Sequence, residues 1–306
     1  MKVSNREFKI INSVAEYHAL LRLEKPRHPL MSIINFSNIK SFNPPIGVTL
    51  VINLYCITIK HDADCLMRYG PSHYDFNDGV MFFIKSGQVV NLQRASEKAQ
   101  AGYMLLIHPD FFRSFPLGIK IKRYRFFEYA IHEGLFLSER EKLQINAIMA
   151  GIETEYHTNI DMFSQEAIIT FIELVLVYAN RFFNRQFITR MAKNDQLLVQ
   201  VEKLLDEYYA ENWVTKNGLP TVQYLADRLN MSANYLSDSL RVTSGSSAQS
   251  HIQQKILEEA KTLLSTSQLS VSEIAYRLGF ERPQSLNKLF KRKVALSPLE
   301  YRASFN

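Results

Sequence analysis

Residues 225–240 (LADRLNMSANYLSDSL) and residues 274–290 (IAYRLGFERPQSLNKLF) carry the same pattern, and this pattern decides the fold of the C-terminal part of the chain. Each stretch begins with an apolar residue and Ala, and four residues after that Ala comes Asn230 or Gly279, followed by another apolar residue. The small Ala lets a second helix approach closely, and Asn or Gly accepts the positive φ of a tight turn between helices. Each stretch is therefore predicted to be a helix-turn-helix, and two copies are much stronger evidence than one.

The segments around the two copies contain signals for the start of helices. Thr221 and Ser232 are predicted to cap the two helices of the first copy. Ser-x-x-Glu capping boxes that begin at Ser270 and Ser297 predict the start of the second copy and of a last helix. Between the copies, residues 248–264 carry apolar residues at every fourth position, which predicts a helix about 25 Å long. A spacer of that length can hold two recognition helices about 34 Å apart, so that one chain reads two successive major grooves.

The composition is that of a globular protein with room for two domains. The chain has 306 residues, of which 46% are hydrophobic and 22% are charged, so disorder and fibrous structure are excluded. Cys56 and Cys65 are not spaced as a redox or zinc motif and are predicted to be free thiols. The first ten residues lack the apolar core of a signal peptide, and the most apolar helix candidate, residues 167–179, is too short to span a bilayer. We therefore expect a cytoplasmic protein with no membrane partner.

The positive charge of the chain is concentrated in one place. The formal net charge is +6, yet from residue 195 onward Lys and Arg barely outnumber Asp and Glu. Residues 282–293, at and just after the start of the second predicted recognition helix, contain five basic residues and no acid. Such a run is often only a solvated helix face. Its place on the second helix of a helix-turn-helix favours contacts with DNA phosphates.

The N-terminal half has a different pattern. Between residues 31 and 110, short apolar runs rich in Ile, Val, Phe and Tyr alternate with turn residues, which predicts an antiparallel barrel or sandwich. Two helices are predicted over about 138–183, the first beginning with a capping box at Ser138. Their surplus apolar surface indicates either a dimer interface or a simple cover for the barrel. The polar segment 186–197 is the predicted linker between a domain at 1–185 and a second domain at 198–306.

Three segments of the C-terminal domain together resemble the signature of the AraC/XylS family of bacterial transcription regulators: EEAKTLL (258–264), IAYRLGFERPQSLNKLFKRK (274–293) and LSPLEYR (296–302). The resemblance covers about the last hundred residues. It implies an α+β fold class, with an N-terminal cupin-like antiparallel β-barrel and helical hairpin, followed by an all-α DNA-binding domain with two helix-turn-helix modules. It also implies sensing and dimerisation by the N-terminal domain, and promoter DNA and RNA polymerase as partners.

The resemblance also assigns residues to DNA contacts. The residues that it places against the bases are Asn234, Ser237 and Asp238 in the first module and Gln284, Asn287 and Lys288 in the second. Amide side chains pair well with adenine, and Lys donates to guanine. The residues expected at the phosphates are Arg282, Lys291, Arg292 and Lys293, which set register without reading sequence. Two departures from the family pattern are Asp238, where a basic or amide residue is common, and Ala295, where Gly is usual.

The signal that the N-terminal domain senses is poorly specified by its residues. Arg68, Tyr69, His73 and Tyr74 form a cluster that can line a pocket for a small anion or polar ligand, although a strand edge with exposed polar side chains explains them more simply. The sequence has no His-x-His pair, phosphate-binding Gly loop or nucleophile motif, so we expect no metal, no cofactor and no enzyme activity. The predicted function is a sequence-specific, dimeric transcription regulator controlled by a small-molecule effector. The alternative is a metal-dependent cupin-type enzyme with a helical appendage.

Overall fold

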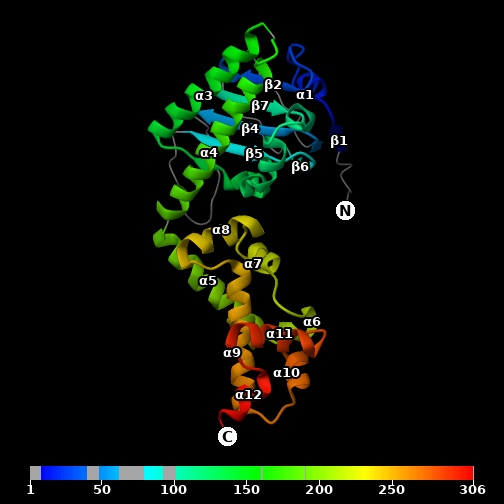
Figure 1. The fold of residues 1–306 in the computed structure, drawn as a ribbon, viewed down its shortest axis with the longest axis vertical. Helices are drawn as coiled ribbons and strands as arrows, with labels where there is room; N and C mark the ends of the chain where they lie inside the picture. Colours follow the sequence, from blue (N-terminus) through cyan, green and yellow to red (C-terminus); the bar gives the residue numbers. More distant parts are fainter. Residues whose placement is uncertain are drawn as a thin grey trace, which may run out of the picture. The chain divides into compact units, whose positions relative to one another are not determined.

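The computed structural model describes residues 8–39, 48–61, 79–91, 101–159, 161–189 and 191–305. The chain divides into two compact units, Met1–Gln186 and Phe187–Asn306 (Figure 1). The predicted linker, 186–197, contains the end of one long helix and the beginning of the next. Among the residues in these ranges, no helix combines the length and the apolar character needed to cross a membrane.

The described strands of the N-terminal unit form two sheets. The five-stranded sheet has the order β2-β7-β4-β5-β8, and the three-stranded sheet has the order β1-β3-β6. The strands are β1 (Phe8–Ile11), β2 (Met31–Asn35), β3 (Thr49–Ile52), β4 (Tyr55–His61), β5 (Val80–Ile84), β6 (Gln88–Asn91), β7 (Ala101–Ile107) and β8 (Leu135–Phe136). All pairs are antiparallel except β1 with β3, which pair in parallel from Phe8 opposite Thr49 to Ile11 opposite Ile52.

The α+β fold class is confirmed, while the described strands form two sheets in place of the expected antiparallel barrel, and one of their pairs is parallel. The first strand joins β3 in parallel and thereby ends the small sheet, while the two-residue strand β8 ends the large one. Among the described strands, therefore, neither sheet closes into a barrel. They share one core, because apolar side chains from both sheets pack in a single cluster: Ile11, Leu50, Ile52 and Val90 from the small sheet with Ile34, Cys56, Met104 and Leu106 from the large one.

Helices complete the N-terminal unit. They are α1 (Val14–Leu20), α2 (Leu117–Lys120), α3 (Glu139–His157) and α4 (Ser164–Thr189), with short 3-10 turns η1 to η5 at 36–38, 109–112, 121–123, 125–128 and 131–133. Helix α3 packs against β2 and β7. It begins at the capping box in which the Ser138 hydroxyl accepts from the Glu141 amide and the Glu141 carboxylate accepts from the Ser138 amide. Burial raises the pKa of the free Cys56 thiol to about 12, which disfavours the thiolate form that reacts; Cys65 lies outside the described residues.

The described part of the C-terminal unit is helical. Its helices are α5 (Met191–Ala210), α6 (Trp213–Asn217), α7 (Val222–Arg228), α8 (Ala233–Ser244), α9 (Ala248–Thr266), α10 (Val271–Arg277), α11 (Pro283–Val294) and α12 (Pro298–Ala303). Helix α9 runs through the unit, with α7 and α8 toward one end and α10 to α12 toward the other (Figure 1). At 19 residues it is about 28 Å long. One apolar core, which includes Leu236, Ile252, Leu286 and Phe290, connects both ends.

Candidate DNA interface

The first helix-turn-helix consists of α7 and α8. Thr221 caps α7 by accepting from the Tyr224 amide, and Ser232 caps α8 by accepting from the Tyr235 amide. Asn230 between the helices has a φ of 54°, which places it in the left-handed region that the turn requires.

The second helix-turn-helix, α10 and α11, repeats this geometry. Gly279 takes the place of Asn230 with a φ of 90°. In both modules the residue after the turn donates to the carbonyl of the Ala in the first helix: Met231 N to Ala226 O at 2.9 Å, and Phe280 N to Ala275 O at 3.0 Å. Both Ala residues are fully buried, and the two helices of each module pack against each other. The repeated sequence therefore forms the repeated structure that it predicts.

The second recognition helix, α11, separates an apolar face from a polar one. Leu286, Leu289 and Phe290 are buried in the core of the unit. The predicted base-reading residues Gln284, Asn287 and Lys288 are all exposed, and their spacing of three and four residues places them on one face of the helix. A row of two amides and one ammonium group suits adenine and guanine edges in a major groove.

The predicted phosphate contacts flank that face. Arg282 precedes α11, whereas Lys291, Arg292 and Lys293 occupy its last turn, and all four are exposed. No ion pair between described residues involves any of these four side chains or Lys288. Lys291 is close enough to Glu300 to help lower the pKa of that carboxyl, after the hydrogen bonds from Ser297. The basic run is therefore available to an anionic partner.

The first recognition helix, α8, presents a different surface. Ser237 is buried, with 8% of its area exposed, and Asn234 is partly exposed. The Asp238 carboxylate accepts from the Arg241 guanidinium one turn later at 2.7 Å, and the Asp238 side chain is only 13% exposed. Arg241 was not among the predicted contacts, although its position three residues after Asp238 is the spacing of an intrahelical ion pair. The two modules are thus chemically unequal.

The predicted effector residues Arg68, Tyr69, His73 and Tyr74 lie outside the described residues. The described part of the N-terminal unit has a cavity of about 220 Å³ where α3 ends and α4 begins. Met31, Phe111 and Ile168 contribute buried apolar surface to it, and Arg27 and His28 contribute polar surface. Burial lowers the pKa of the His28 imidazole. Within the same described part, no three His, Cys, Asp or Glu side chains gather as metal ligands would.

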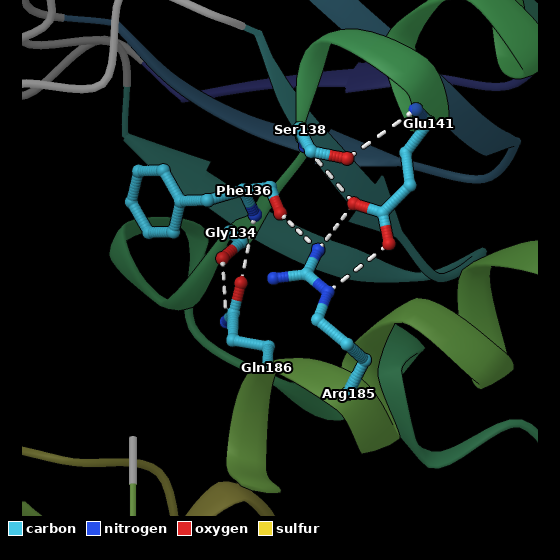
Figure 2. Close-up of polar contacts among 6 residues, drawn as sticks. All are labelled: Gly134, Phe136, Ser138, Glu141, Arg185 and Gln186. Atoms are coloured by element: carbon cyan, nitrogen blue, oxygen red, sulfur yellow. Dashed lines mark hydrogen bonds and ion pairs between the residues drawn. The ribbon is translucent and has the colours of Figure 1, made fainter. Parts of the chain in front are cut away.

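Arg185 and Gln186 on α4 are the last residues of the N-terminal unit, and their side chains form a network of hydrogen bonds with the rest of that unit (Figure 2). The Arg185 guanidinium donates from Nε to Glu141 Oε1 at 3.0 Å and from Nη2 to both Glu141 Oε2 and the Phe136 carbonyl. The buried Gln186 side chain accepts from the Phe136 amide at 2.8 Å and donates to the Gly134 carbonyl at 3.3 Å. We call these contacts the α4 clasp. It fixes α4 to strand β8 and to the start of α3.

Comparison with known proteins identifies the C-terminal modules. Residues 225–304 match a family model described as a helix-turn-helix domain. This region is an AraC-type helix-turn-helix domain. Within it, the α10–α11 module holds the exposed basic face, and α12 is its last helix.

Curated relatives match the same end of the chain. The raffinose operon transcriptional regulatory protein RafR of Pediococcus pentosaceus is 37% identical over 97 residues, which are 32% of this chain and 34% of the relative. The transcriptional activator RhaS of Citrobacter koseri is 31% identical over 111 residues, which are 36% of this chain and 37% of the relative. The chain therefore spans well under half the length of these curated relatives. The solved DNA-binding domain of AdpA in complex with a target DNA is 33% identical, covers 33% of this chain and 91% of that domain, and gives a TM-score of 0.28.

Proposed function

We propose that this protein is a sequence-specific DNA-binding transcription regulator whose second helix-turn-helix supplies most of the affinity. The exposed face of α11 carries the proposal, because Gln284, Asn287 and Lys288 project from one side of a helix whose other side is buried. The basic residues at both ends of that helix add phosphate contacts on each side of the reading face. The names of the matched relatives, which describe regulators of transcription, support a regulator in place of an enzyme.

The first module contributes less in this proposal. Its acidic Asp238 is held by Arg241, so the helix offers the DNA a neutralised pair in place of a free cation. A carboxylate in the major groove accepts from cytosine N4, which gives this module a narrow preference and little phosphate attraction. The AraC-type domain then binds with one strong and one weak element.

The proposed partners are promoter DNA, RNA polymerase, a small-molecule effector of the N-terminal unit and a second copy of the chain. Function in the cytoplasm follows from the DNA partner. A row of residues on α4 supports dimerisation: Thr170, Leu174, Val177 and Arg181 follow one another at spacings of four, three and four. Leu174 is 41% exposed and Val177 is 49% exposed. Sedimentation at micromolar concentration should show a dimer that Leu174→Arg with Val177→Arg dissociates; a clean monomer of the unaltered protein removes this part of the proposal.

The DNA proposal is tested by selecting genomic fragments with the purified full-length protein at moderate salt and sequencing what is recovered. One enriched site with two short elements about one helical turn apart is the expected result. Uniform, salt-sensitive recovery contradicts sequence-specific binding.

Variants then separate reading from charge at the selected site. Gln284→Ala with Lys288→Ala should lower the preference for this site over random DNA by about 10- to 100-fold per lost base contact. Lys291→Ala should weaken binding to all sequences and reduce the slope of log affinity against log salt by about 1. Lys122→Ala, which removes the same charge from an exposed site in the N-terminal unit, is the control and should change neither quantity. An unchanged preference in the double variant excludes base reading by α11.

A further inference from the structure

The second helix-turn-helix touches the segment that leads into the first one, in addition to being joined to it by α9. The contact is at Gly279, the turn residue of the second module. A Cβ built on Gly279 would lie 2.8 Å from the carbonyl carbon of Gly218, 2.9 Å from the Leu219 nitrogen and 2.9 Å from Val214 Cγ1. Because real Cβ atoms do not approach backbone this closely, only glycine fits here, quite apart from its φ of 90°.

The backbone that Gly279 meets leads straight into the first module. Leu219 is two residues before Thr221, which caps α7. The Gly218 carbonyl is itself fixed, because it accepts from the Tyr208 hydroxyl of α5 at 3.0 Å. The turn of the second module therefore rests on an anchored segment at the entrance of the first.

Arg302 holds the second module at its other end. Its guanidinium donates from Nε to the Leu264 carbonyl at 3.2 Å and from Nη2 to the Leu269 carbonyl at 2.7 Å. Leu264 lies in the last turn of α9, where carbonyls lack partners within the helix, and Leu269 immediately precedes Ser270, the cap of α10. One planar side chain thus bridges the end of the connecting helix and the start of the second module.

Helix α12 supports this bridge from within the core. The Tyr301 ring packs against the ring of Phe290 in α11 at 5.4 Å, and the Lys261 ammonium of α9 lies 5.9 Å from the centre of the Tyr301 ring. The helix that carries Arg302 is therefore itself fixed to both α9 and α11.

We infer that Gly279 and Arg302 are positioning residues that fix the distance and angle between α8 and α11, so that the spacing between two DNA elements becomes part of the sequence that the protein reads. The inference rests on the proposed DNA-binding function. Two modules joined only by a helix end could turn about residues 267–270. Contacts at both ends of the second module remove that freedom. One inserted base pair shifts the second element by about 3.4 Å and rotates it by about 35°, which a rigid pair cannot follow.

The first test compares full-length protein on the selected site with zero, one or two base pairs inserted between its elements. We expect the unaltered protein to lose at least about tenfold in affinity per inserted base pair, as for the loss of a base contact. The affinity of Arg302→Gln should change by less than about threefold per inserted base pair. Its affinity for DNA that carries only the second element should equal that of the unaltered protein. Arg302→Lys should show the same weak dependence on insertions as Arg302→Gln, because an ammonium group does not present the planar fork that spans both carbonyls. Arg277→Gln, at an exposed arginine of α10, is the charge-matched control and should retain the unaltered profile.

A purely structural role for Arg302 predicts another outcome, in which affinity falls equally at every spacing and at the single element. That outcome, or an unchanged profile in a folded Arg302→Gln, overturns the inference. A flat profile in the unaltered protein overturns it without any variant. Failure of the unaltered protein to select a site is a failure of the proposed function.

The second test needs no DNA. Spin labels at Asn234→Cys and Asn287→Cys, in a Cys65→Ser background, report the distance between the two recognition helices. The unaltered pair should give one narrow distance distribution, and Arg302→Gln should broaden it. A broad distribution in the otherwise unaltered protein shows independent modules and contradicts the inference, whatever the outcome of DNA selection.

Discussion

Replacing Ala295 by Gly should stabilise the C-terminal unit. Ala295 ends α11 with a φ of 63°, and its amide donates to the Lys291 carbonyl at 3.1 Å. An L-residue in this left-handed region costs about 1–2 kcal/mol, which Gly does not incur. Gly is more flexible in the unfolded chain, and this extra conformational entropy lowers the free energy of unfolding by about 0.4–1 kcal/mol. The expected net gain is about 0.5–1 kcal/mol, or about 2–5 °C in the unfolding midpoint.

The first module supplies the matched reverse substitution. Gly245 ends α8 with a φ of 72°, its amide donates to the Arg241 carbonyl at 3.0 Å, and a Cβ at this position would meet no atom within 4 Å. Gly245→Ala should therefore destabilise the same unit by about the amount that Ala295→Gly gains, with no steric contribution. Urea and thermal unfolding followed by far-UV circular dichroism measure both. If the two substitutions shift the midpoint in the same direction, backbone conformation at these caps is not the cause and the reasoning is refuted.

Three further predictions concern stability. Arg185→Met should cost about 2–4 kcal/mol because it leaves the largely buried Glu141 carboxylate without its cation, whereas Lys85→Met, at an exposed ion pair, should cost less than about 1 kcal/mol in the same urea titration. Burial lowers the pKa of His18 below 6.5 in the folded protein, so the unfolded chain binds the proton more readily. Stability should fall as pH drops below about 6.5, and His18→Gln should make the plot of midpoint against pH shallower. Ser297→Ala removes the cap of α12 and should lower the free energy of unfolding by about 1 kcal/mol in denaturant titrations.

The helix-turn-helix modules could be predicted from the sequence because their signals are local. The turn requires a residue that tolerates positive φ, and Asn230 and Gly279 stand at that position in both copies. The helix starts are encoded within four residues of each cap, as at Ser270 and Ser297. The exposed face of α11 follows from helical periodicity alone.

Other features depend on partners that are distant along the chain. The parallel pairing of β1 with β3 joins residues about forty positions apart, and no periodicity in either strand specifies it. The acceptors of Arg302 lie 33 and 38 residues away, so its sequence context shows only a basic residue near the end of a helix. The closeness of Gly279 to Gly218 is equally hidden, because each glycine can be explained by its own turn.

The α4 clasp also covers the outer edge of the large sheet. Strand β8 is the last strand of that sheet, and the amide and carbonyl of Phe136 that point away from β5 are bonded to Gln186 and Arg185. An open strand edge is a template for pairing with another chain. Here two side chains take the place of the next strand, so the edge offers no free backbone at Phe136. The clasp should consequently disfavour edge-to-edge association, and loss of both side chains should expose a short apolar strand to self-association.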